Sequence, residues 1–143
     1  MTSRDFLPLF LREKYQELDE RPELNERCEK ITDFLWLIEK VWCISNANYQ
    51  EWIWVKHETL DIVDSYDDTT MYFLEDVEDV LEARDRIEIT DSQYEALKKL
   101  YEMVDAYDDL IDRPDNDEGI VNDPRWHKIR EYAKQVYKKL TDS

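Results

Sequence analysis

Two stretches of the chain carry carboxylates at a spacing that could bind a metal ion. Both follow the positions i, i+3, i+4 and i+7: Glu75, Glu78, Asp79 and Glu82 in the first stretch, and Asp105, Asp108, Asp109 and Asp112 in the second. On a helix these positions share one face. Two neighbouring helices that each supply carboxylates can hold Mg²⁺ for phosphoryl chemistry. One candidate function is therefore magnesium-dependent hydrolysis.

The pairs Glu75-x-x-Glu78 and Asp105-x-x-Asp108 are similar to the two-helix acidic motif of the all-α nucleotide pyrophosphohydrolases. The resemblance covers these four positions, and Asp105 stands where that family has Glu. It implies a Mg²⁺-dependent nucleotide hydrolase with these four residues as metal ligands. Because 36 of the 143 residues are acidic, such spacings also arise by chance, and a solvated acidic face explains them as well.

Aromatic side chains set among carboxylates indicate a different chemistry, that of a protein interface. On helical spacing Trp54 shares a face with acidic residues that follow it, and Tyr72 does the same one helix later. Desolvated aromatic anchors surrounded by charges are typical of binding hot spots with electrostatic steering. The predicted partner-binding residues are Trp54, Glu58, Asp61, Asp68, Tyr72, Glu75, Asp76 and Asp79. The alternative is that Trp54 and Tyr72 are ordinary core residues.

Other reactive constellations are poorly supported. A single glycine rules out a glycine-rich phosphate loop and a nucleophile elbow. The loop 114–119 fails as a calcium loop because Pro114 and Arg125 would take its first and twelfth positions. His57-Glu58-x-x-Asp61 lacks the ligands that a catalytic zinc needs, since the chain has one other histidine. We predict no catalytic residues and no cofactor.

Charge is the strongest signal in the composition. The chain has 19 basic and 36 acidic residues, a net charge of −17. Residues 58–123 hold 23 of the acids and five bases, whereas residues 124–143 hold six bases and two acids. Such a chain is repelled by nucleic acid and by anionic membranes, and it is attracted to basic proteins. No apolar run approaches the length of a membrane span.

Helical periodicity and scarce turn residues predict an all-α fold, a single compact bundle of five to six helices that covers residues 1–143. Apolar residues in the stretch 24–42 step by four and three, which predicts one long helix. Residues 50–56 fit a helix or, through the run from Trp52, a buried strand. Cys28 and Cys43 lie in helical pattern and are predicted to be reduced core thiols of a cytoplasmic protein. The remaining apolar rows predict helices over 5–18, 45–66, 67–82, 90–111 and 123–140, with Trp52 on the inner row of the second and Ile111 on that of the fourth. Thr90 with Gln93 predicts a capping box, and Asp123 with Pro124 predicts the start of the last helix. The predicted inner row of that helix is Trp126, Ile129, Ala133, Val136 and Leu140.

The sequence therefore predicts an acidic helical binding protein that docks its negative surface onto a basic partner. In composition it looks like immunity proteins against nuclease toxins and like nucleic-acid mimics, both of which occupy a cationic site. The predicted partner is a basic protein, most concretely a nuclease toxin or another nucleic-acid-binding protein, and no direct contact to nucleic acid or membrane is expected. Two alternatives stay open: the magnesium-dependent hydrolase, and a structural or adaptor protein whose acidity serves solubility alone.

Overall fold

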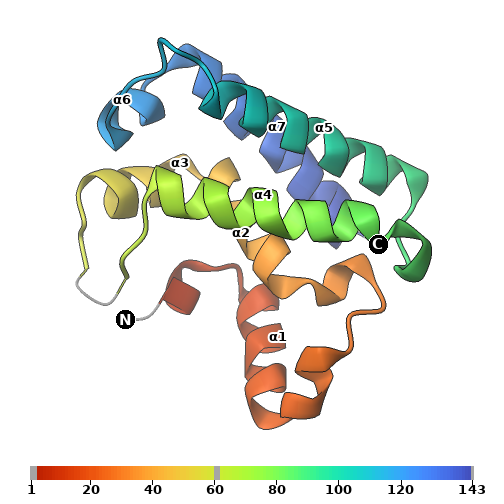
Figure 1. The fold of residues 1–143 in the computed structure, drawn as a ribbon. Helices are drawn as coiled ribbons and strands as arrows, with labels where there is room; N and C mark the ends of the chain where they lie inside the picture. Colours follow the sequence, from red (N-terminus) through yellow and green to blue (C-terminus); the bar gives the residue numbers. More distant parts are fainter. Residues whose placement is uncertain (1–2, 60–61, 143) are drawn as a thin grey trace.

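The computed structural model describes residues 3–59 and 62–142 (Figure 1). In these ranges the chain forms seven α-helices and no strand, which confirms the all-α prediction with slightly more helices than expected. The α-helices are α1 (Leu9–Glu20), α2 (Leu35–Ser45), α3 (Ala47–Tyr49), α4 (Tyr66–Glu82), α5 (Asp91–Asp108), α6 (Asp117–Val121) and α7 (Pro124–Thr141). Short 3₁₀ segments lie at Ser3–Phe6 (η1), Pro22–Glu26 (η2), Ile31–Asp33 (η3) and Arg84–Arg86 (η5), and a π-helix, η4, covers Gln50–Val55. None of the described helices is long and apolar enough to cross a membrane.

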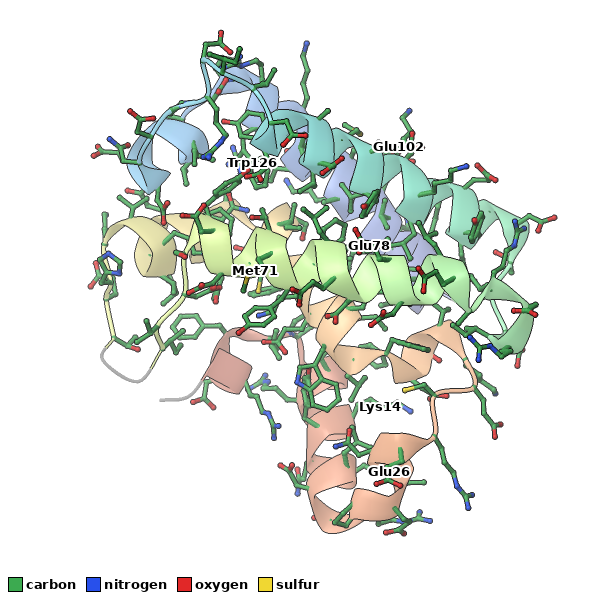
Figure 2. All side chains as sticks on the ribbon, viewed as in Figure 1. Lys14, Glu26, Met71, Glu78, Glu102 and Trp126 are labelled. Atoms are coloured by element: carbon green, nitrogen blue, oxygen red, sulfur yellow. The ribbon has the colours of Figure 1, made fainter. Side chains whose placement is uncertain are left out.

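The main core lies among four helices. α7 packs against α2 and α5, and α4 packs against the same two helices from the other side. In Figure 2 Trp126 lies between α4 and the α5–α7 pair, and its side chain is fully buried. α1 projects away from this group, and a second, smaller core of Leu7, Leu11, Tyr15, Leu35 and Ile38 attaches it to α2.

Local signals near the end of the chain are confirmed. Thr90 and Gln93 form the predicted capping box, each side chain accepting from the other residue's backbone N–H. Asp123 caps α7 and Pro124 begins it, as expected. The predicted inner row of α7 is buried throughout: Trp126, Ile129, Ala133, Val136 and Leu140. Ile111 was expected on the inner face of α5, but α5 ends at Asp108 and Ile111 is fully exposed.

The predicted long helix over 24–42 is wrong in its first half. Residues 22–33 form two short 3₁₀ segments, and α2 begins only at Leu35. A tertiary contact replaces the helix here: Ile31 N–H donates to the Glu88 carbonyl at 3.2 Å, and Glu88 N–H donates to the Glu29 carbonyl at 2.8 Å. Cys28 is consequently exposed rather than in the core, whereas Cys43 is buried and both thiols are free.

The predicted helix over 45–66 is also replaced. α3 runs directly into the π-helix η4, where Lys56 N–H donates to the Glu51 carbonyl five residues earlier at 3.0 Å. His57, with φ of 51°, follows η4 in the left-handed region. The strand alternative for 50–56 is therefore wrong. Since a π-helix has a longer period than an α-helix, the 3.6-residue pattern assigns its sides incorrectly.

Candidate functional site

The outward side of α4 is strongly acidic, with Met71 and Tyr72 exposed among the carboxylates. The helix holds seven acidic and no basic residues, namely Asp67, Asp68, Glu75, Asp76, Glu78, Asp79 and Glu82, which we call the acidic ridge. All are exposed except Asp76, which is half-buried. None of the seven forms an ion pair with any residue that the structure describes. Like charges one turn apart, such as Glu75 and Asp79, each weaken a helix by a few tenths of a kcal/mol. The repulsion within the ridge is therefore not offset by any ion pair among the described residues.

A groove of about 330 Å³ runs along the α2 side of the ridge. α2, α3, α4 and the segment before α4 all contribute to it, and the lining residues are Glu39, Lys40, Tyr49, Ile62, Val63, Asp64, Asp68 and Tyr72. Val63 is 89% exposed and Tyr72 is 49% exposed, so two apolar surfaces are open to solvent beside the carboxylates. Acidic groups and exposed apolar groups thus meet in one place.

Asp64 is the anchor of the groove wall. Its side chain is buried, and its carboxylate accepts hydrogen bonds from the Tyr49 hydroxyl at 2.6 Å and from Trp54 Nε1 at 3.3 Å. The Thr69 hydroxyl and the Ser65 backbone N–H donate to the same group at 2.8 and 2.9 Å. A buried carboxylate without a cation in contact needs such donors to remain in place. The network ties α3, η4 and the start of α4 together and so fixes the shape of the groove.

Lys40 is the one basic residue that lines the groove. Its Nζ lies 5.7 Å from the centre of the Tyr72 ring, within the range of a cation–π interaction. Burial acts to lower the pKa of Lys40, whereas the nearby Cys43, Glu39, Asp64 and Asp76 act to raise it, and the pKa lies above its ordinary value. Burial raises the pKa of the Cys43 thiol well above normal.

Asp76 shows the electrostatic strain on the ridge. Partial burial raises the pKa of its carboxyl above the ordinary value, and the neighbouring Asp79 and Glu75 raise it further against the opposing effect of Lys40. A positive group brought to this part of α4 would relieve that strain. The site is accordingly suited to a cationic, partly apolar ligand.

The structure brings most of the predicted partner-binding residues together. Asp68, Tyr72, Glu75, Asp76 and Asp79 all lie on the outward side of α4. Glu58 is exposed in the segment between η4 and α4 but does not line the groove. Asp61 lies outside the described residues.

The prediction of Trp54 as an exposed anchor is wrong. Trp54 is 1% exposed and packs against the rings of Tyr66 and Trp126. Trp52, expected in the core, is instead 46% exposed and packs edge-on against the ring of Phe6. The π-helical turn exchanges the two tryptophans, because its hydrogen bonds span five residues rather than four.

The alternative metal site is not formed. Among the described residues, no three His, Cys, Asp or Glu side chains are placed to hold a metal ion together. Glu78 instead accepts a hydrogen bond from the Tyr101 hydroxyl at 2.7 Å, and Asp108 accepts one from the Tyr66 hydroxyl at 2.9 Å. Glu75 and Asp105 are exposed on different helices. The resemblance to the pyrophosphohydrolase motif therefore does not extend to a shared metal centre.

Four other hollows carry weaker signals, one of which is a shallow apolar one of about 260 Å³ beside Met103, Leu110 and Ile129. A second, of about 300 Å³, lies between α1 and residues 24–35 and is lined by both signs of charge, Lys14 and Arg27 among them. A third, of about 510 Å³, lies between α5 and α7, where Lys98, Lys99 and Lys139 face Glu95 and Glu102. A fourth, of about 380 Å³, follows the contact between residues 30–32 and 87–93. Their mixed or sparse charges define no ligand as clearly as the groove does.

Sequence reasoning missed Glu39, Lys40, Val63 and Asp64 as parts of the site. The only signal for them is the acidity of the neighbourhood, since they come from two separate segments that folding brings together. Comparison with protein-family models, with curated proteins and with solved structures found no match for this chain.

Proposed function

We propose that this chain is a binding protein that docks the acidic ridge and the groove beside it onto a basic protein partner. The observation that carries the proposal is the ridge itself, seven carboxylates on one helix without a single ion pair among the described residues. Unpaired like charges destabilise the free protein slightly, and a basic partner converts that penalty into binding energy.

The partner we propose is a protein whose own basic site binds nucleic acid. At about 1.5 Å per residue the span from Asp67 to Glu82 is about 22 Å long, so its seven carboxylates average about one per 3–4 Å, with five of them within Glu75–Glu82. A single nucleic-acid strand carries about one charge per 3.4 Å. The ridge thus has the linear charge density of the ligand that such a site evolved to hold. Occupying that site would inhibit the partner, as an immunity protein or a nucleic-acid mimic does.

Exposed aromatic and apolar side chains beside the ridge are the groups that would slow dissociation of the partner. Long-range attraction speeds association, whereas slow dissociation depends on desolvated anchors. Tyr72 and Val63 are exposed at the groove, and Trp52 is exposed on the nearby η4. Tyr72 takes over the role that the sequence assigned to Trp54. We place this function in the cytoplasm, where the free thiols of Cys28 and Cys43 remain reduced.

The test compares two variants that remove the same charge from different helices. Asp68→Asn with Asp79→Asn changes the ridge, and Glu95→Gln with Glu102→Gln removes two exposed carboxylates from α5. The probe is a labelled peptide that alternates lysine with serine, and its affinity is measured by fluorescence anisotropy. We expect the ridge variant to weaken binding about fivefold or more and the α5 variant to weaken it less than about twofold.

A second measurement addresses inhibition. The peptide is first bound to a short DNA duplex, and the protein is then added to displace the DNA. The native chain should release the DNA, and the ridge variant should need a several-fold higher concentration. If both variants lose affinity equally, only net charge matters, and the acidity serves solubility rather than docking. An association rate that stays flat between low and physiological salt would also contradict the proposal.

A further inference from the structure

Lys40 is a positively charged side chain that lies among carboxylates. It extends from α2 into the groove among Glu39, Asp64, Asp68 and Tyr72. Its ammonium forms no ion pair or hydrogen bond with any described residue. The field of the surrounding carboxylates and the face of the Tyr72 ring hold it there, rather than a direct polar contact.

A group held in this way is easily displaced. The side chain of lysine has a flexible stem of four carbons, and moving its ammonium into water breaks no hydrogen bond to the protein. The groove already holds about 330 Å³ of open space beside Lys40, and moving the ammonium out also uncovers the face of the Tyr72 ring. That space is sufficient for one lysine or arginine side chain from another protein.

Lys40 and a basic side chain of the partner repel each other when both lie in the groove. Two like charges about 6 Å apart repel each other weakly in water and more strongly near a protein surface. A basic side chain that enters the groove therefore favours a position of Lys40 outside it. Asp64 keeps its donors from Tyr49 and Thr69 throughout, so the wall of the groove does not depend on which cation is present.

We propose that Lys40 is a resident stand-in for a basic side chain of the partner, and that a partner lysine or arginine binds over Tyr72 by displacing it. This inference rests on the proposed function, of which it specifies one contact. It also gives Lys40 a role in specificity. A ligand with weak or diffuse positive charge does not displace the resident ammonium, so the groove selects a segment that delivers a full cationic side chain.

The experiment uses the full chain and the same lysine–serine peptide, together with a matched arginine–serine peptide. Lys40→Met removes the resident cation, and Lys14→Met removes one from α1, on the arm that Figure 2 shows apart from α4. Both variants change the net charge equally. We expect Lys40→Met to bind both peptides about three- to tenfold more tightly, and Lys14→Met to change affinity by less than about twofold. Lys40→Gln serves as a second variant, and thermal melting shows whether each variant is folded.

The outcomes separate this inference from the proposed function. If Lys40→Met and Lys14→Met tighten binding equally, only net charge matters. If Lys40→Met and Lys40→Gln bind the peptides as the native chain does, or more weakly, Lys40 does not compete with the ligand. Either result overturns the stand-in role while the ridge remains a docking surface. If the peptides bind the native chain but Tyr72→Ala and the ridge variant have no effect, or if they do not bind at all, the proposed function fails and the inference fails with it.

Discussion

Trp54 and Trp52 offer a direct test of how η4 supports the groove. Trp54→Ala should destabilise the protein strongly, because its side chain is 1% exposed and packs on Tyr66 and Trp126. Removing a buried aromatic side chain costs about 3–5 kcal/mol through lost burial and the cavity that remains. The change also removes a donor from the buried Asp64 carboxylate, which places the expected loss in the upper half of that range.

Trp52→Ala is the matched control, two residues away in the same π-helix. Trp52 is 46% exposed, so its replacement should cost about 1 kcal/mol or less. Urea unfolding followed by circular dichroism measures both free energies, provided that the slope with denaturant stays the same. In a thermal scan the two variants should differ by about 5 °C or more, since about 1 kcal/mol shifts the midpoint by about 2–4 °C at this size. Equal losses, or a larger loss for Trp52→Ala, would refute the placement of η4.

Two further predictions concern titration and thiol chemistry. Because the folded pKa of Asp76 is raised, the folded state binds its proton more readily than the unfolded chain does, and this group lowers stability once the pH rises above its ordinary range. Asp76→Asn should therefore stabilise the protein at neutral pH, by more than the exposed control Glu102→Gln. The gain in stability should vanish in acid, where Asp76 is protonated in both the folded and the unfolded state. A variant that is less stable than the native chain at neutral pH would contradict this. Cys28 should react with a thiol reagent in the native protein, slowly because burial and Asp33 raise its pKa, whereas Cys43 should react only after unfolding, and equal reactivity of the two would show that the 22–33 segment is misplaced.

Some of the fold could be predicted from the sequence because it depends on local hydrogen bonds and spacing. The Thr90–Gln93 capping box, the Asp123 cap and the buried row of α7 each involve residues a few positions apart. The acidic face of α4 follows from the same rule, since residues three, four and seven apart lie on one side of a helix. The charge of the ridge is likewise a property of composition, and tertiary packing does not change it.

The remainder was decided by contacts between distant segments. The stripe over 24–42 has good helical spacing, yet its first half exchanges hydrogen bonds with Glu88, and this tertiary pairing outweighs a local preference of a few tenths of a kcal/mol per residue. The π-helix η4 changes the period and exchanges Trp52 with Trp54, which no pattern based on 3.6 residues can show. The groove exists only because α2, α3 and α4 converge around Asp64. A carboxylate becomes a buried anchor, and a lysine becomes the occupant of an acidic groove, only when folding brings their partners from other parts of the chain.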